Sequence, residues 1–259
     1  MSVVTPKKGL GQHFLKDMNI ARKIVSSIEN DSVSAVLEIG PGTGVLTQFL
    51  LGNKNFETYR IEIDHESIAY LKSKFPELGN RLMEGDFLKI NLNEVFSEQL
   101  IITGNFPYYI SSQIFFRILD YKDLVSEVVC MVQKEVADRI CAVPGNKTYG
   151  ILSVLLQAYY QTTSLFTVNP SVFFPPPKVK SAVMRLSRNN RKDLECDPRL
   201  FRQIVKTGFN QRRKVLRNSL KNLLTDTNLN IPVLQMRPEQ LSVDQFIGLT
   251  RMIGQAKIK

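Results

Sequence analysis

Two kinds of apolar pattern alternate along the first two thirds of the chain. Short apolar runs bounded by turn residues occupy 35–39, 58–63, 100–103, 128–132, 164–168 and 182–186, and another run ends at Asp86. Apolar positions with a period of three to four residues occupy 18–28, 45–51, 65–75, 136–142 and 150–160. Runs of the first kind predict strands, and the longer period predicts helices. Their alternation predicts an α/β fold with a mostly parallel sheet.

The pattern changes after Arg188. Residues 189–193 are polar and linker-like, and the remainder shows helical patterns only, at 198–209, 212–224 and 238–253. Pro232 and Pro238 interrupt these patterns, because proline breaks a helix interior. We therefore predict two domains, an α/β domain over residues 1–187 and a small all-helical domain over residues 188–259.

The formal charge follows the same boundary. Residues 1–187 carry 19 Lys and Arg against 18 Asp and Glu, a net of +1, whereas residues 188–259 carry 15 against 6, a net of +9. Between Arg199 and Lys221 there are eight basic residues and no acidic residue. Such a run is usually a solvated helix face, but the lack of acidic partners favours a polyanion, and nucleic acid before an anionic membrane.

Several classes of protein are excluded early. The N-terminal residues contain Lys7, Lys8 and Lys16 without an apolar run behind them, so they do not predict a signal peptide. No stretch reaches the roughly 20 apolar residues of a membrane-spanning helix. The 3 cysteines form no CxxC pair and only 2 histidines accompany them, so neither a metal site nor a disulfide framework is predicted. We expect a cytoplasmic protein with reduced thiols, no bound metal and no membrane association.

A glycine-rich loop follows the first predicted strand of the α/β domain. The segment Glu38-Ile39-Gly40-Pro41-Gly42-Thr43-Gly44 departs from the dinucleotide fingerprint, and Pro41 removes a backbone N–H that a pyrophosphate would use. An ordinary turn also explains such a loop. Acidic residues close the next two strands: Glu62, about 20 residues beyond the loop, suits ribose hydroxyls, and Asp86 suits an adenine amino group. Solvated strand ends are often acidic, but the three positions in this order predict a nucleoside site.

The fourth strand ends in Asn105-Phe106-Pro107-Tyr108. An exocyclic amine of a nucleobase is a poor nucleophile, because its lone pair is delocalised into the ring. The Asn105 amide oxygen and the Pro107 carbonyl provide two acceptors for the N–H groups of such an amine, and Tyr108 provides a ring on which the base stacks. Asn and Pro are also common in turns, but after the glycine loop this segment predicts amine methylation.

Taken together, the motifs resemble those of one family. In order along the chain they are Gly9–Leu15 (GLGQHFL), Glu38–Gly44 (EIGPGTG), Gly104–Tyr108 (GNFPY), Phe173–Val179 (FFPPPKV), Phe209–Lys214 (FNQRRK) and Arg217–Leu220 (RNSL). Nearly the whole chain resembles the ribosomal RNA adenine N6,N6-dimethyltransferases, the KsgA family of the small ribosomal subunit. The resemblance implies a class I, Rossmann-like methyltransferase fold, S-adenosylmethionine as cofactor, and two adjacent adenosines near the 3′ end of small-subunit rRNA as substrate.

The resemblance also assigns roles to individual residues. Cofactor contacts fall on His13, Leu15, Gly40, Glu62, Asp86 and Asn105. Asn105 and the Pro107 carbonyl hold the target amine, Tyr108 stacks on the adenine, and Phe173 closes its other side. Phe173 and Phe174 are read equally well as a hydrophobic clasp beneath a rigid loop. Position 13 is Asn in many relatives, which leaves the role of the His13 side chain open.

The resemblance gives the basic helical domain a partner. Arg212, Arg213, Lys214 and Arg217 are assigned to RNA binding, with the substrate presented in a partly assembled small ribosomal subunit. We expect a monomeric enzyme of ribosome biogenesis and rRNA processing. Two alternatives stay open: a large-subunit rRNA adenine dimethyltransferase of the macrolide-resistance type, and a non-catalytic RNA-binding assembly factor.

Overall fold

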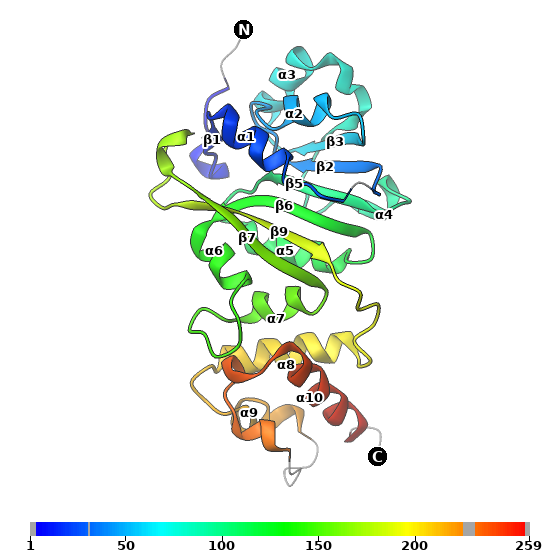
Figure 1. The fold of residues 1–259 in the computed structure, drawn as a ribbon, viewed down its shortest axis with the longest axis vertical. Helices are drawn as coiled ribbons and strands as arrows, with labels where there is room; N and C mark the ends of the chain where they lie inside the picture. The colour runs from blue at the N-terminus through cyan, green and yellow to red at the C-terminus, as the bar shows by residue number, and fades with distance from the viewer. Residues whose placement is uncertain (1–3, 31, 225–230, 257–259) are drawn as a thin grey trace. The chain divides into compact units, whose positions relative to one another are not determined.

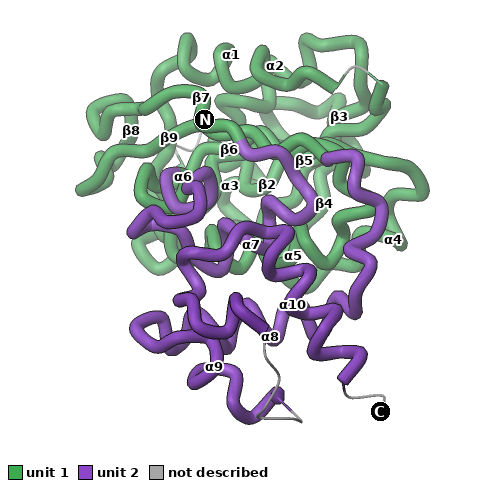
Figure 2. Tube along the Cα trace, turned by 60° about the horizontal axis from the view of Figure 1, so that its bottom comes forward, with its two compact units in different colours: residues 1–137, 163–188 green, residues 138–162, 189–259 purple. Residues whose placement is uncertain are grey.

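The structure, a computed structural model, describes residues 4–30, 32–224 and 231–256. The chain divides into two compact units, coloured separately in Figure 2. The first unit comprises residues 1–137 and 163–188, and the second comprises residues 138–162 and 189–259.

A seven-stranded sheet forms the centre of the first unit. Its order is β4-β3-β2-β5-β6-β9-β7, with β2 (Ala35–Ile39), β3 (Glu57–Glu62), β4 (Leu82–Glu84), β5 (Leu100–Asn105), β6 (Val125–Gln133), β7 (Tyr160–Val168) and β9 (Ser181–Arg188). The first five strands in this order pair in parallel, and β9 pairs antiparallel to β6. The predicted mostly parallel sheet is confirmed. A separate antiparallel pair joins β1 (Phe14–Leu15) to β8 (Phe173–Phe174).

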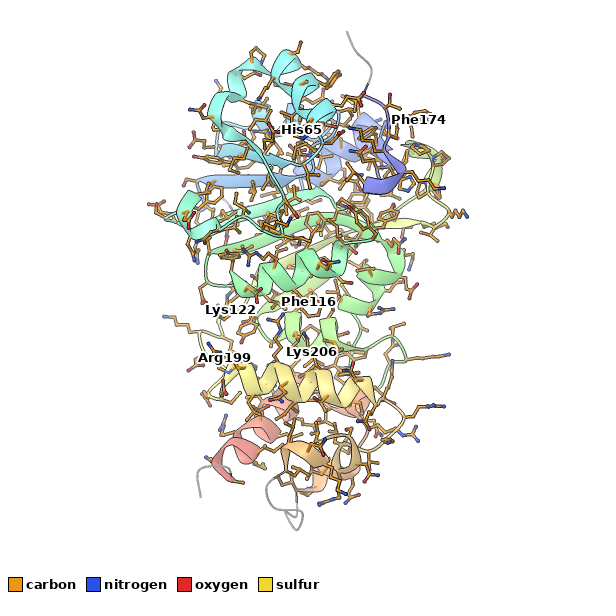
Figure 3. The ribbon with its side chains drawn as sticks, turned by 180° about the vertical axis from the view of Figure 1, so that it is seen from behind. His65, Phe116, Lys122, Phe174, Arg199 and Lys206 are labelled. Carbon is orange, nitrogen blue, oxygen red and sulfur yellow. The ribbon has the colours of Figure 1, made fainter. Side chains whose placement is uncertain are left out.

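Helices cover both faces of this sheet. Helix α1 (Met18–Val25) lies on the face turned to the viewer in Figure 1, and α5 (Ser111–Asp120), marked by Phe116, lies on the opposite face in Figure 3. Asp17 caps α1 by accepting the backbone N–H groups of Asn19 and Ile20, as its position before the amphipathic pattern predicts. The remaining helices are α2 (Thr47–Gly52), α3 (His65–Lys74), α4 (Leu92–Val95) and α6 (Lys134–Ile140), with 3₁₀ turns η1 (Lys8–Leu10), η2 (Pro76–Arg81) and η3 (Pro170–Val172).

Packed helices make up the second unit. Helix α8 (Pro198–Asn210) packs against α7 (Ile151–Gln157) and α10 (Val243–Ala256). Phe209 contacts the rings of Tyr149 and Phe246 at centroid distances of 6.1 and 6.0 Å. Helix α9 (Leu216–Ser219) and the 3₁₀ turns η4 (Lys221–Leu223), η5 (Pro232–Gln235) and η6 (Pro238–Gln240) complete the unit. Residues 138–162 therefore cluster with the C-terminal helices, whereas the predicted domain boundary at 187/188 assigned them to the α/β domain.

Two helical predictions differ from the structure, and one long helix was not predicted. The pattern at 212–224 contains only α9 and η4, because residues 211–214 form a turn in which the Lys214 N–H donates to the Gln211 carbonyl at 2.8 Å. The last helix begins at Val243 rather than at 238, where Ser242 and Gln245 bond each other's backbone N–H groups in a capping box. Helix α5 was not predicted, because it follows the Asn105–Tyr108 segment without a capping side chain.

Candidate functional site

The carboxyl ends of four parallel strands meet at one edge of the sheet in the first unit. Loops after adjacent strands are tied together there: the Gly40 N–H donates to the Ile61 carbonyl at 2.9 Å, and the Gly85 N–H donates to the Glu62 carbonyl at 2.8 Å. A cavity of about 310 Å³ opens at this edge. Ligands of open α/β sheets bind at this edge of the sheet.

Most of the predicted site residues line this cavity. The lining contains His13, Gly40, Glu62, Asp86, Asn105, Pro107 and Tyr108. These residues come from five separate segments of the chain, and the sheet brings them together. Leu15 and Phe173 do not line the cavity.

Glu62 is buried at the end of β3 and holds the backbone of two loops. One carboxylate oxygen accepts the Gly42 N–H at 3.0 Å, and the other accepts the N–H groups of Ile63 and Asp64 at 2.9 and 3.0 Å. Burial raises the pKa of Glu62, and these backbone donors oppose the shift. A carboxylate has about four lone-pair sites, so acceptor capacity remains toward the cavity.

Asp86 lies at the start of the loop after β4. One of its carboxylate oxygens accepts the Leu88 N–H at 2.9 Å, and the other is 3.9 Å from the Lys89 ammonium. The side chain is 26% exposed. Its carboxylate is therefore oriented by the loop backbone while it lines the cavity.

Asn105 ends β5, and its side-chain amide is oriented by a distant segment. The Asn105 Nδ2 donates to the His13 backbone carbonyl at 2.9 Å. The amide oxygen is thereby left as the acceptor. On the His13 side chain, Nδ1 lies 2.7 Å from the Pro175 carbonyl, and the ring stacks on Tyr108 with centroids 5.6 Å apart. The His13 side chain thus contacts two of the motifs, Phe173–Val179 through Pro175 and Gly104–Tyr108 through Tyr108.

Pro107 and Tyr108 continue from Asn105 along the cavity wall. The Pro107 carbonyl accepts the Ile110 N–H at 3.2 Å, and its second lone pair stays available. The Tyr108 hydroxyl is hydrogen-bonded to the Ser181 hydroxyl at 2.5 Å, which anchors the ring at its far end. Burial raises the pKa of Tyr108, so the phenol is neutral at physiological pH.

Leu15 and Phe173 face each other across the β1–β8 pair and point into the core. Leu15 is 4% exposed, Phe173 is 1% exposed, and both belong to one hydrophobic cluster. Successive residues of a strand point to opposite sides, so Phe174 is 57% exposed instead (Figure 3). The burial of Phe173 places it away from the cavity and does not support its predicted role as the second ring against the adenine; it fits the hydrophobic-clasp interpretation, whereas the exposed Phe174 does not.

The cavity suits a cationic nucleoside. Its lining contains two carboxylates, Glu62 and Asp86, and no Lys or Arg. A Cβ built on Gly40 or Gly85 meets nothing within 4 Å, so both backbones border open space. The volume is at the lower end of the usual range for ligand pockets. A lining with two carboxylates and no basic side chain fits the sulfonium and ribose of S-adenosylmethionine better than it fits a pyrophosphate.

One buried group beneath the glycine loop was not predicted. Glu38 is 2% exposed, accepts the Thr47 hydroxyl at 2.7 Å and lies 3.4 Å from the Arg60 guanidinium, itself 0% exposed. Burial raises the pKa of Glu38, and Arg60 opposes the shift. The buried Glu38–Arg60 pair supports the glycine-rich loop from its interior side. The signal was present in the sequence as an acid and a base within otherwise apolar strands.

The predicted RNA-binding residues lie in the second unit around the turn before α9. Arg212 is held internally, because it lies 3.7 Å from the Glu239 carboxylate and donates to the Asn146 carbonyl at 3.3 Å. Arg213 and Lys214 are exposed, and Arg217 is half-buried. Arg213 and Lys214 are therefore the more accessible cations of this group.

Comparison with known proteins agrees with this geometry. The model of the family described as ribosomal RNA adenine dimethylase matches residues 4–254. The chain belongs to this family. It is 55% identical to the ribosomal RNA small subunit methyltransferase A of Bacteroides fragilis, over 99% of this chain and 95% of that protein. The protein of the same name from Parabacteroides distasonis is 55% identical over 96% of this chain and 94% of its own length. A crystal structure of a dimethyladenosine transferase from Plasmodium falciparum covers 95% of this chain and 98% of its own, with 28% identity and a TM-score of 0.78.

Membership of the family identifies the chain as an S-adenosylmethionine-dependent rRNA methyltransferase. The expected class I methyltransferase fold is confirmed by this match and by the strand order. Among the residues that the structure describes, no helix is both long and apolar enough to cross a membrane.

Proposed function

We propose that this rRNA adenine dimethylase methylates the N6 amines of two adjacent adenosines near the 3′ end of small-subunit rRNA, within a partly assembled small ribosomal subunit. The observation that carries the proposal is the Asn105 amide, oriented by the His13 carbonyl at 2.9 Å on the wall of a cavity that also holds Glu62 and Asp86. We further propose that the enzyme is cytoplasmic and acts as a monomer.

The carboxylates at the strand ends would hold the cofactor. Glu62 would accept from a ribose hydroxyl with the lone-pair site that its three backbone bonds leave, Asp86 would accept from the adenine amine, and Gly40 would allow close approach of the backbone. When bound, S-adenosylmethionine supplies an electrophilic methyl group on a sulfonium. The absence of Lys and Arg from the lining avoids repulsion of that cation.

Asn105, Pro107 and Tyr108 act on the target base. The Asn105 amide oxygen and the Pro107 carbonyl accept the two N–H groups of the N6 amine and direct its lone pair into the cavity. Tyr108, anchored at its hydroxyl by Ser181, stacks on the adenine. Asn105 and Pro107 would hold the amine toward the methyl group that bound S-adenosylmethionine would supply, and the methylated amine would lose one proton. Catalysis is then mainly positioning.

The second unit would bind the RNA backbone. Arg213 and Lys214 are exposed beside Arg212 and Arg217, in the part of the chain that carries a net charge of +9. Exposed cations of this kind contact phosphates and make binding salt-dependent. The adenosine must leave its loop or stack to reach Asn105, so a structured RNA with single-stranded bases is the substrate.

The two alternatives are less well supported. Relatives 55% identical over nearly the whole chain carry the small-subunit name, which argues against a large-subunit substrate. A non-catalytic assembly factor would have no need for the full set Gly40, Glu62, Asp86 and Asn105 around one cavity.

The test is to incubate the protein with labelled S-adenosylmethionine and, in separate reactions, small or large ribosomal subunits that lack the modification, and then to map the methylated nucleotides by primer extension. We expect label on two neighbouring adenosines of small-subunit rRNA. Label on large-subunit rRNA alone, or none with either subunit, would contradict the proposal.

A further inference from the structure

The N-terminal residues form a strap at the cavity of the first unit. We use the name N-terminal strap for residues 5–13. Its last four residues, Leu10, Gly11, Gln12 and His13, line the cavity together with the strand-end residues. Gly11 has φ +57°, and a Cβ built there would lie 2.8 Å from the Tyr109 ring, so the strap backbone rests directly on that ring.

Asp64 makes most of the carboxylate contacts that hold the strap, and Glu66, 3.8 Å from the Lys7 ammonium, adds to them. The Lys7 ammonium forms a hydrogen-bonded ion pair with one Asp64 oxygen, and the Gln12 amide donates to the other at 3.3 Å. The Lys7 N–H also donates to the Gln12 side-chain oxygen at 2.8 Å, which closes the strap on itself. Outside Asp64, the Thr5 N–H donates to Glu66 at 3.0 Å.

The position of Asp64 makes these contacts informative. Asp64 is the N-cap residue of α3, where an Asp side chain normally accepts a backbone N–H of the first turn. Here it makes no such bond. Its oxygens instead receive Lys7, Gln12 and the Ser67 hydroxyl, the last at 2.8 Å. The Asp64 carboxylate thus accepts hydrogen bonds from the strap instead of from the backbone N–H groups of α3.

The strap connects Asp64 to the catalytic motif. Gln12, bound by Asp64, directly precedes His13, whose backbone carbonyl accepts the Asn105 amide at 2.9 Å. The His13 carbonyl belongs to the backbone and cannot move by a side-chain rotation. Its position therefore depends on the contacts that hold the strap in place. If the strap lifts, Asn105 loses the partner that selects its amide orientation.

We propose that Asp64 is a positioning residue that latches the N-terminal strap over the cofactor cavity and thereby sets the orientation of Asn105. The inference rests on the proposed function for its catalytic consequence, but the latch itself involves only residues of this chain. Asp64 is not among the residues that line the cavity. Through Gln12 and His13 it slows the dissociation of the cofactor and fixes the orientation of the Asn105 amide, which accepts the target amine.

Two latch variants and one matched control test the inference. Lys7→Met removes the strap side of the ion pair at an exposed position, and Asp64→Asn removes the charge on the buried side. Glu57→Gln is the control, because Glu57 is a carboxylate at the opposite end of β3 that pairs with Arg81 at 3.4 Å. The three variants each remove one charge from an ion pair of the first unit.

The first readout needs neither cofactor nor RNA. Hydrogen exchange of the backbone amides of residues 5–13 is expected to accelerate about ten-fold in Lys7→Met and in Asp64→Asn, and to stay at the wild-type rate in Glu57→Gln. The second readout is the dissociation rate of S-adenosylmethionine, expected to rise about ten-fold in the latch variants. The third is single-turnover methyl transfer at saturating cofactor, expected to fall because Asn105 is no longer held.

A purely structural role for Asp64 would give a different result. The latch variants would then unfold at lower temperature, while the folded proteins kept wild-type exchange in the strap and wild-type cofactor dissociation, and that result would overturn the inference. A wild-type protein that transfers no methyl groups would contradict the proposed function. In that case unchanged strap exchange would still refute the latch, and accelerated exchange confined to Lys7→Met and Asp64→Asn would still support it.

Discussion

The side-chain amide of Asn105 donates to the backbone carbonyl of His13 at 2.9 Å, across 92 positions of the sequence. This bond leaves the amide oxygen as the acceptor that an amine substrate needs. It also joins the end of β5 to the N-terminal strap, so the Asn105–Tyr108 segment and the strap residues that line the cavity are connected.

Asn105→Ala is expected to lower methyl transfer about 10²- to 10³-fold, the usual loss when a preorganised hydrogen-bonding group at the reacting atom is removed. RNA affinity should be unchanged, because the RNA contacts are assigned to the second unit. Single-turnover transfer and a filter-binding titration measure the two quantities. Asn93→Ala, at an exposed position on α4, is the control. Wild-type turnover in Asn105→Ala would contradict the mechanism.

Asp86→Asn is expected to weaken S-adenosylmethionine binding about ten-fold or more, because a hydrogen bond to a charged acceptor becomes one to a neutral acceptor. The variant keeps an oxygen for the Leu88 N–H, so the loop should stay folded. Isothermal calorimetry measures the affinity, with Glu94→Gln on α4 as control. Equal affinities in Asp86→Asn and the wild type would remove Asp86 from the cofactor site.

Gly40→Ala is expected to block the cofactor with only a modest loss of stability. The φ of +64° costs about 1–2 kcal/mol for a residue with a Cβ, but that Cβ meets no protein atom within 4 Å and enters the cavity instead. Gly42→Ala, whose Cβ would lie 2.8 Å from the Phe14 ring, should lose more stability. Thermal unfolding and calorimetry separate the two effects, and Gly52→Ala serves as the neutral control. A Gly40→Ala protein with wild-type affinity would show that the cofactor does not approach this loop.

Acid stability should depend on Asp64. Burial alone would raise the pKa of Asp64, but the hydrogen bonds from Lys7, Ser67 and Gln12 outweigh it and lower the pKa from 3.8 to about 2. A lowered folded-state pKa stabilises the fold above pH 3.8, and this contribution is lost as the pH falls from 3.8 toward 2. Asp64→Asn should therefore lower the free energy of unfolding by about 1–2 kcal/mol at neutral pH, a value discounted for solvent screening of the exposed Lys7.

Urea unfolding of wild type and Asp64→Asn between pH 2 and 7 measures this difference. The two curves should converge toward pH 2. A constant gap over the whole range would show that the Asp64 ion pair does not contribute through its charge.

The double variant Arg213→Ala, Lys214→Ala is expected to lower RNA affinity and to reduce the slope of log affinity against log salt by about one to two. Cofactor affinity should not change, because neither residue lines the cavity. Binding to the rRNA substrate at several salt concentrations measures the slope, with Lys54→Ala, Lys72→Ala in the first unit as the control. An unchanged slope would remove this turn from the RNA interface.

Much of the fold and most of the site follow from local pattern. Short apolar runs predict the parallel strands β2, β3, β5 and β6 and the antiparallel β9, because strands covered on both faces need apolar residues on both faces. Strand-end chemistry then identifies Gly40, Glu62, Asp86 and Asn105, since parallel strands deliver their carboxyl ends to one edge. Helix α5 has apolar residues at helical spacing, Ile114, Phe115 and Ile118, but no capping side chain marks its start, and α9 occupies only part of the helix predicted at 212–224.

The sequence by itself determined the class of fold, the family and the order of the chemical groups, because these depend on periodicity and on motifs within a few residues of each other. Only the tertiary structure decided that Phe173 packs into the core while Phe174 is exposed, because that choice depends on how β8 pairs with β1. It also decided that Asp64 binds the strap and that His13 orients Asn105. Those contacts span 52 to 92 positions, and they exist only once the sheet has brought distant segments to one edge.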